Sequence, residues 1–211
     1  MTRTGAAHSP TPEAIAAHYA SGYEADRLLR GAGRLDRERS RELLGRFLPR
    51  APAVVLFGPL YHLTDRADRV QALREARRVL RPGGALLAAA ISRFASALDG
   101  LCRGFLRDPQ FAEIVRRDLT DGQHRNPTGR PEYFMDTFFH HPDELRAEVG
   151  AAGFGAARVY GVEGPGWLLS DFDAWWDDGA CRDRLLQLAR ALEAEPSLSG
   201  VSAHLMAVAT R

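Results

Sequence analysis

Short apolar runs and amphipathic stretches alternate along the chain, most clearly within residues 54–92. Val54 to Phe57 is an apolar run of strand length, which a glycine and a proline end. Asp65 can cap the stretch that follows, where apolar residues recur at helical spacing. Pro82-Gly83-Gly84 stops that helix, and residues 85–91 are small and apolar on both faces, as in a buried parallel strand. The pattern therefore predicts one strand–helix–strand unit.

The hydrophobic pattern also predicts elements before and after this strand–helix–strand unit. Helices are predicted over residues 11–30 and 36–48, and Tyr19, Tyr23 and Arg27 share one face of the first helix. Residues 58–63 and 120–132 are predicted to be loops. After residue 92, the pattern predicts further helices over 95–107, 110–119, 142–152 and 183–192, and strands over 156–162 and 202–209. The last strand is apolar on both sides except at His204.

Composition narrows the class of protein. A chain of 211 residues with 45% hydrophobic residues can form one α/β domain with a substantial core. The net charge of +1 gives no electrostatic reason to expect nucleic acid or a membrane surface as a partner. All 28 basic residues are arginine, which together with the many alanines and glycines indicates a GC-rich, bacterial genome.

Targeting signals and metal motifs are also not found in the sequence. No apolar run approaches the roughly 20 residues of a membrane span. The N-terminus lacks the apolar core of a signal peptide, so a cytoplasmic protein is expected. Cys102 and Cys181 are too far apart to suggest a disulfide framework or a metal motif, and no metal is expected.

The segment LFGPLYHLTDRADRVQALREARRVLRPGGALLAAAIS resembles the second half of a class I S-adenosylmethionine (SAM)-dependent methyltransferase. The helix that ends in ARRVLRPGG before a strand is its most recognisable part, and GPLYHL looks like the subgroup that acts on small molecules. YASGYEADRLLRGAGRLDRERSRELLGRFLP resembles the N-terminal helical cap of that family, and FFHHPDELRAEVGAAGF resembles the segment before its sixth strand. The resemblance implies SAM as the methyl donor and a small molecule as the acceptor.

The chain departs from the family pattern just before Val54. In the family, a glycine-rich loop follows the first strand, and an acidic residue at the end of the second strand binds ribose. Here residues 48–53 lead directly into Val54, and no GxGxxG or GxGxG pattern is present. Residues 54–57 are either a first strand with a degenerate loop or the family's fourth strand, and the order of the segments that follow favours the fourth.

The expected fold is therefore α/β, a partial Rossmann-like methyltransferase fold in which strands 4 to 7 are recognisable and strands 1 to 3 are missing. Residues 1–52 are expected to form a tail and a helical cap. Residues 53–211 are expected to form the partial methyltransferase domain, with a helical and loop insertion at about 95–140.

The candidate site follows from the position of the strands. Ligands of open α/β sheets bind beyond the carboxyl ends of the strands, which places residues 58–63 at the site. His62 and Tyr61 are the catalytic candidates, since a histidine can act as a base near neutral pH and the tyrosine can contact the substrate. Simple packing or a surface position is the alternative for each of these side chains. By resemblance, the cofactor candidates are Tyr19, Arg27, Phe57 and Gly58, and the substrate candidates are Tyr23, Pro59, Leu60, Phe134, Phe138, His140 and His141.

Three functional hypotheses remain open from the sequence. The first is a small-molecule methyltransferase whose activity the internal deletion impairs, with SAM affinity reduced by several kcal/mol because hydrogen bonds worth about 0.5–1.5 kcal/mol each are lost. The second is a non-catalytic remnant that acts as a binding or oligomerisation module, where the strand at Val54 becomes an exposed edge and supports a homodimer. The third is a chain that the deletion leaves unstable.

Overall fold

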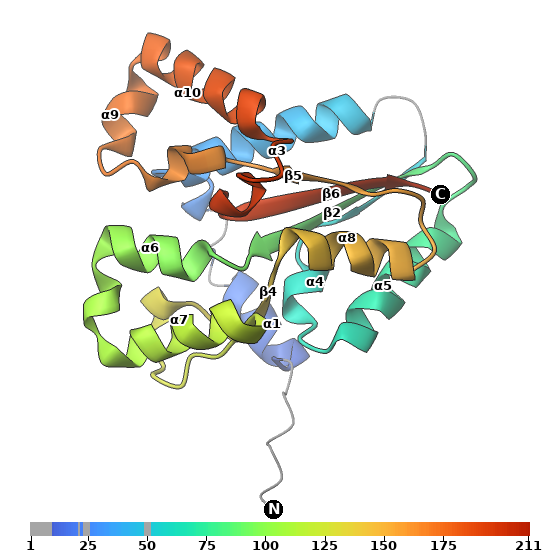
Figure 1. Cartoon of the computed structure of the whole chain (residues 1–211), viewed down its shortest axis with the longest axis horizontal. Coiled ribbons are helices and arrows are strands. Elements are labelled where there is room, and N and C mark those ends of the chain that lie inside the picture. The colour runs from blue at the N-terminus through green and yellow to red at the C-terminus, as the bar shows by residue number, and fades with distance from the viewer. Residues whose placement is uncertain (1–9, 21, 23–25, 49–51) are drawn as a thin grey trace, which may run out of the picture.

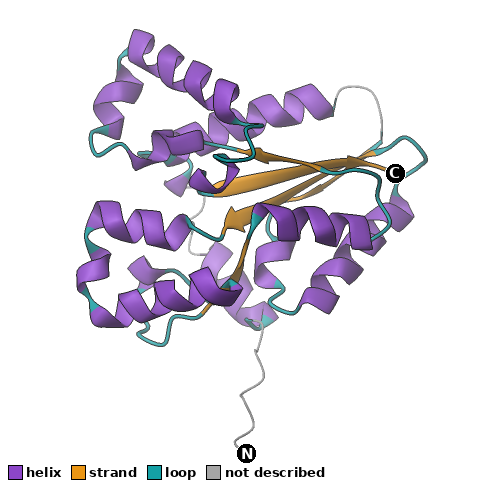
Figure 2. Cartoon of the chain, viewed as in Figure 1, coloured by secondary structure: helices purple, strands orange, loops and turns teal. Residues whose placement is uncertain are grey.

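A mixed β-sheet crosses the centre of the molecule, with helices on both of its faces (Figure 1 and Figure 2). The computed structural model describes residues 10–20, 22, 26–48 and 52–211. Six strands form the sheet within these ranges. The α/β class predicted from the sequence is therefore confirmed.

The sheet is organised around its longest strand, β2 (Ala85–Ser92). β6 (His204–Thr210) pairs with β2 in antiparallel orientation along nearly its whole length, and β5 (Arg158–Gly161) pairs with the other side of β6. On the opposite edge of β2, β1 (Ala53–Leu56) pairs in parallel with its first half, and β4 (Thr137–His140) pairs in parallel with its end. The two-residue β3, Gln123–His124, continues the sheet beyond β4. Among the described strands, β1 pairs only with β2, so it is an edge strand.

Local sequence signals account for most of the helix boundaries. Asp65 caps α5 (Arg66–Val79), as predicted, because its side chain accepts a hydrogen bond from the Ala67 N–H at 2.6 Å. His141 and Glu144 form a capping box at the start of α8 (Pro142–Ala151). None of the described helices is long and apolar enough to cross a membrane. The longer helices are α1 (Pro12–Ala20), α3 (Gly33–Phe47), α5 (Arg66–Val79), α6 (Ala95–Arg103), α7 (Pro109–Asp121), α8 (Pro142–Ala151), α9 (Phe172–Asp177) and α10 (Gly179–Leu192).

The core lies on both faces of β2. Leu86 packs with Leu73 of α5 and Leu145 of α8 on one face. The next residue, Leu87, packs with Leu43 of α3 on the other face, because successive side chains of a strand point in opposite directions. This two-sided burial explains the continuous apolar run of β2 and confirms the prediction of a buried strand. It also places α3, expected in the helical cap, on a face of the sheet.

Three predictions of local structure are wrong. The helix expected over residues 11–30 is not continuous, because α1 ends at Ala20 and Gly22 lies in a turn. Residues 59–62, expected in a loop, form the short helix α4 (Pro59–His62), with proline at its first turn. Part of the loop expected over residues 120–132 is β3, and the aromatic segment that follows contains β4. The pairing of β4 with β2 joins residues distant in the chain, so local patterns could not indicate it.

Candidate functional site

A cavity of about 240 Å³ lies at the edge of the sheet where the parallel strands β2 and β4 end. Ile91 from β2 and Phe139 from β4 contribute to its lining. His204 also lines it, because β6 runs antiparallel and therefore begins at the edge where β2 ends. This is the edge at which open α/β sheets bind their ligands.

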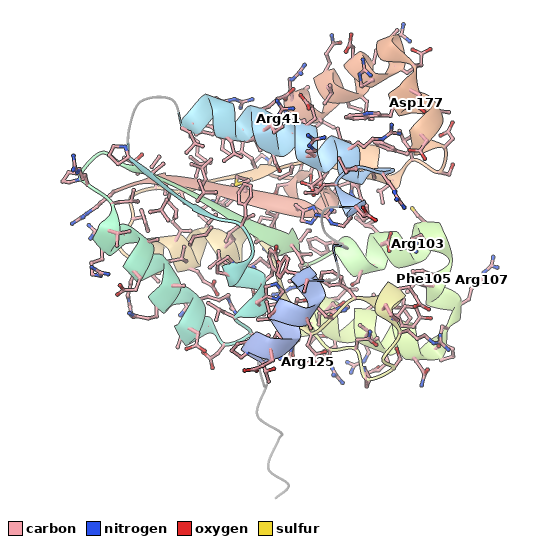
Figure 3. All side chains as sticks on the ribbon, turned by 180° about the vertical axis from the view of Figure 1, so that it is seen from behind. Arg41, Arg103, Phe105, Arg107, Arg125 and Asp177 are labelled. Carbon is pink, nitrogen blue, oxygen red and sulfur yellow. The ribbon has the colours of Figure 1, made fainter. Side chains whose placement is uncertain are left out.

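Aromatic side chains form one wall of the cavity. Phe111 of α7 packs against Tyr133 with ring centroids 4.7 Å apart. Phe134 lies beside them, and Trp167 contributes from a short 3-10 helix, Gly164–Leu168. Arg103 of α6, which also lines the cavity, places its guanidinium 4.4 Å from the ring centroid of Phe105 (Figure 3). The wall is thus suited to a flat, largely apolar molecule.

A hydrogen-bonded histidine holds this wall in place. His124 is buried, and its ring stacks on Phe139 at 4.6 Å between centroids. Its Nδ1 lies 2.8 Å from Asp118 and its Nε2 2.8 Å from the carbonyl oxygen of Tyr133. Ser96 donates a hydrogen bond of 2.6 Å to the same Asp118 oxygen. Both ring nitrogens of His124 are engaged within the protein, so we assign it a structural role.

The predicted catalytic pair lies on another wall. Tyr61 and His62 of α4 both line the cavity, and Tyr19 of α1 joins them. The Tyr19 hydroxyl lies 3.1 Å from Nε2 of His62 and 3.5 Å from the Tyr61 hydroxyl. The structure therefore brings together three residues that the sequence analysis selected, with His62 only 6% exposed.

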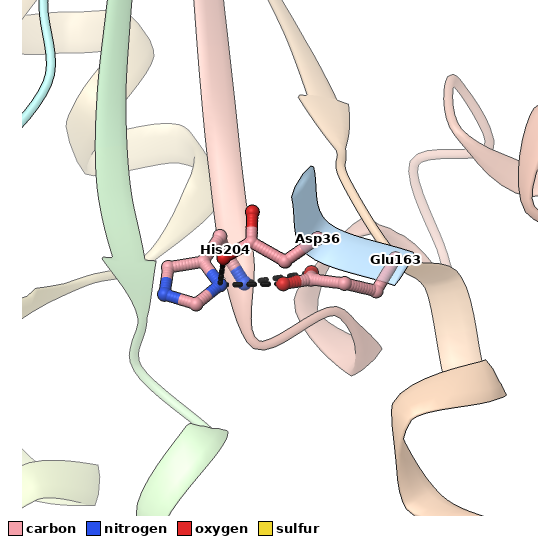
Figure 4. Close-up of side chains that lie close together, drawn as sticks. All are labelled: Asp36, Glu163 and His204. Carbon is pink, nitrogen blue, oxygen red and sulfur yellow. Dashed lines mark hydrogen bonds and ion pairs between the residues drawn. The ribbon is translucent and has the colours of Figure 1, made fainter. Parts of the chain in front are cut away.

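A histidine that lines the cavity, His204, contacts two buried carboxylates behind it. Nδ1 of His204 donates a hydrogen bond of 2.5 Å to Glu163, whose other oxygen accepts the His204 backbone N–H at 3.0 Å (Figure 4). Asp36 lies on the same side of the ring, with an oxygen 3.6 Å from Nδ1. Arg27, which also lines the cavity, donates to Asp36 at 3.0 Å. We refer to Asp36, Glu163 and His204 as the histidine–carboxylate cluster.

The histidine–carboxylate cluster is arranged to keep His204 protonated. Burial by itself lowers the pKa of His204, but the negative charges of Asp36 and Glu163 outweigh it and raise that pKa to about 9. At neutral pH the ring is therefore an imidazolium. The ligand atoms of the three residues lie within 4.8 Å of one another, a spacing that a metal ion could use. With the ring protonated, Nδ1 donates to Glu163 and is not free to bind a metal ion, so we interpret the cluster as a hydrogen-bond donor and not as a metal ligand set.

Three of the predicted substrate residues lie in the core and not at the cavity. Leu60 is fully buried in the core cluster with Leu73 and Leu145, because the helical turn of α4 directs it away from Tyr61. Phe138 and His140 point to the face of β4 opposite Phe139, as the alternation of a strand requires. Their assignment to the substrate site is corrected accordingly.

Phe138 and His140 belong instead to a buried charged cluster. The Arg69 guanidinium lies 3.5 Å from the Phe138 ring centroid and donates to both oxygens of Glu148, at 2.7 and 3.0 Å. Nε2 of His140 lies 3.2 Å from Glu148. Burial raises the pKa of Glu148, but the hydrogen bonds from His140 and Arg69 outweigh it and lower that pKa to about 2. This cluster joins α5, β4 and α8 and does not reach the cavity.

The remaining predicted residues lie in several places. Phe134 and Arg27 line the cavity, whereas Phe57, just after β1, is 44% exposed and does not. Gly58 and Pro59 flank the start of α4 without lining the cavity. His141 serves as the cap of α8. Tyr23 lies outside the described residues.

Sequence reasoning missed the histidine–carboxylate cluster. His204 was noted only as the one polar residue of an apolar strand, and no role was given to Glu163. A lone histidine at the start of a buried strand was the available signal. The carboxylates that raise its pKa come from distant parts of the chain, so their proximity depends on the fold.

Comparison with known proteins gives no family assignment. No family model matches the chain, and no curated protein matches it. Its function is therefore argued from the site.

Proposed function

We propose that this chain has the architecture of the second half of a class I SAM-dependent methyltransferase, and that its cavity binds a small-molecule methyl acceptor. β1, α5 and β2 form the parallel strand–helix–strand unit on which the sequence resemblance rests. The cavity lies beyond the end of β2, where a fold of this type binds its ligand. A partial Rossmann-like arrangement is the interpretation of the sheet that we favour.

The observation that carries the proposal is the composition of the cavity. Aromatic side chains share the lining with polar and charged groups, among them His62, Tyr61 and His204. Small-molecule sites typically combine an apolar surface with a small number of placed polar groups. The volume of about 240 Å³ lies just below the usual range of about 300–1,000 Å³, so the ligand is expected to be small.

The described residues fit SAM poorly. Gly58 follows β1, but the helix that starts there has only four residues and offers no extended anion-binding terminus. Within the described ranges no strand lies beyond β1 to supply an acidic residue for the ribose. We therefore derive no methyl-transfer step, and we expect SAM to bind several kcal/mol more weakly than a complete site would bind it, at about 0.5–1.5 kcal/mol for each lost hydrogen bond.

Calorimetric titration with SAM and with its demethylated product, S-adenosylhomocysteine, tests whether the chain binds the methyl donor. We expect weak binding, without saturation in the micromolar range, by a protein whose circular dichroism spectrum shows it to be folded. Saturable micromolar binding of SAM would show that the SAM site is complete. It would overturn the proposal that the chain lacks part of this site. Failure to unfold cooperatively on heating would instead support the unstable-chain hypothesis.

A second candidate function is supported by the exposed edge of the sheet. Val55 and Phe57, in and just after β1, are 41% and 44% exposed, although both are large and apolar. An edge strand also presents unpaired backbone groups that another strand can bind. A non-catalytic module that forms a homodimer through β1 is therefore the alternative to a methyltransferase.

A further inference from the structure

The histidine–carboxylate cluster gives the cavity a hydrogen-bond donor with a fixed direction. Glu163 binds Nδ1 and the backbone N–H of His204, so the ring is held from one side. The other ring nitrogen, Nε2, is turned away from both carboxylates (Figure 4). Because His204 lines the cavity and its side chain is 25% exposed, Nε2 is the ring atom available to a ligand.

The charges around His204 decide what this donor can bind. The groups that act on the ring are Asp36 from α3, Glu163 after β5 and Arg27, which pairs with Asp36. With two carboxylates nearby, the imidazolium stays charged well above neutral pH and can only donate at Nε2. A ligand must therefore place an acceptor atom there, and hydrogen bonds between two charged partners are the stronger kind.

The cavity contains further charged groups on other elements. Arg103 and Asp99 of α6 and Glu132 also line it, and so does His62 of α4. Arg103 and Asp99 form an ion pair at 3.3 Å, and Arg27 pairs with Asp36 at 3.0 Å, so the charges of these groups largely cancel. The requirement for an acceptor atom on the ligand therefore comes from His204.

We propose that the cavity binds a small aromatic molecule whose carboxylate or phenolate oxygen accepts a hydrogen bond from Nε2 of His204. The aromatic part follows from the wall of Phe111, Tyr133 and Phe134, and the oxygen follows from the orientation of His204. This inference rests on the proposed function and deepens it by naming the chemical class of the ligand. Asp36 and Glu163 act as positioning residues, because they orient and charge His204 without reaching the ligand.

Benzoate and benzamide are suitable probes because they share a shape and differ in charge. Calorimetry at pH 7 is expected to show benzoate binding about tenfold more tightly than benzamide, as a charge-assisted hydrogen bond would provide. Benzoate affinity should fall as the pH rises through about 9, where His204 loses its proton. Benzoate itself stays ionised over that range, and benzamide affinity should stay constant.

Two variants assign the preference to His204. His204→Gln should abolish both the preference for benzoate and its pH dependence. Glu163→Gln should shift the pH dependence to lower pH, because one of the two negative charges that raise the pKa of His204 is lost. Glu75→Gln is the matched control, since Glu75 lies exposed on α5 and pairs with Arg78. If His204→Gln does not fold, the pH titration of the wild-type protein with the two probes decides the question.

The outcomes separate this inference from the proposed function. Equal affinity for benzoate and benzamide would overturn the oxygen-anion site while leaving a small-molecule cavity. A benzoate preference that survives in His204→Gln would also overturn it and point to Arg27 or Arg103. No binding of either probe at millimolar concentration by the folded protein would overturn both proposals. The SAM titration measures binding of the methyl donor and is independent of these results.

Discussion

Two histidines, His140 in the core and His204 at the cavity, show how neighbouring charges decide the role of a residue. Burial lowers the pKa of His140, and the positive charge of Arg69 lowers it further. Glu148 raises that pKa, but not enough to cancel the effect of burial. His204 has two carboxylates beside it, and they raise its pKa to about 9 despite burial. The same residue type is therefore a neutral part of the core at one position and a charged donor at the cavity at the other.

The buried pair of Arg69 and Glu148 leads to a prediction about stability. Glu148→Gln should lower the free energy of unfolding at pH 7 by about 3–5 kcal/mol, because Arg69 would remain buried without its counter-charge. Urea unfolding followed by circular dichroism measures this, with Glu75→Gln expected to lie within about 0.5 kcal/mol of the wild type. A loss below about 1 kcal/mol would contradict the prediction.

The same pair makes the stability of the wild-type protein depend on pH in the acid range. The pKa of Glu148 is lowered from 4.5 to about 2 in the folded state, so its stabilising contribution is present above about pH 4.5. That contribution should be lost as the pH falls from 4.5 to about 2. Glu148→Gln should lack this part of the pH dependence, which urea unfolding at a series of pH values would reveal.

At the scale of elements, a single backbone conformation positions α4. Gly58 has φ of 124°, a value that residues with a side chain rarely adopt. This conformation turns the chain directly from β1 into α4 and so brings Tyr61 and His62 to the cavity. A Cβ atom at this position would make only an ordinary contact of 3.4 Å with the Tyr19 hydroxyl, so the backbone conformation is what requires glycine. The junction therefore depends on glycine.

Replacing two glycines by alanine should have opposite effects. Gly58→Ala is expected to reduce the free energy of unfolding by about 1–3 kcal/mol, because the backbone there becomes strained. Gly45→Ala, within α3 and with open space around it, should increase stability by about 0.5–1 kcal/mol. Thermal or urea unfolding of both variants tests the contrast. Equal effects of the two substitutions would show that the junction at Gly58 is not constrained.

At the scale of the whole molecule, the sheet is covered on its faces but open at one edge. Helices pack on both faces of β2 and β6, whereas β1 has only β2 as a partner among the described strands. Exposed apolar side chains such as Val55 in β1 are more typical of a strand that is covered by a neighbouring strand. The alternative function proposed above, a homodimer, would provide that neighbour.

Self-association is therefore expected and can be measured by size-exclusion chromatography with light scattering. Val55→Lys should shift the protein towards the monomer, because a lysine on an edge strand opposes strand pairing. Val79→Lys is the matched control, since Val79 is an exposed valine of the helix α5 and does not belong to a strand. A wild-type protein that stays monomeric at high concentration would rule out the homodimer.

Local sequence patterns were sufficient to predict the strand–helix–strand unit from β1 to β2 and the burial of β2. Cap residues, turn residues and apolar periodicity are local signals, and they are strong in this segment. The sequence also placed Tyr19, Tyr61 and His62 among the candidate site residues, and the structure puts all three at the cavity.

Which other side chains share that cavity depends on contacts between distant parts of the chain. Whether Phe138 or Phe139 faces it depends on the register of β4 against β2, which joins distant segments. Asp36, Glu163 and His204 come from three separate parts of the chain, and the charge of His204 exists only because the fold brings them together. Local patterns carry no information on such contacts, because the energy that fixes them comes from packing and electrostatics across the whole core.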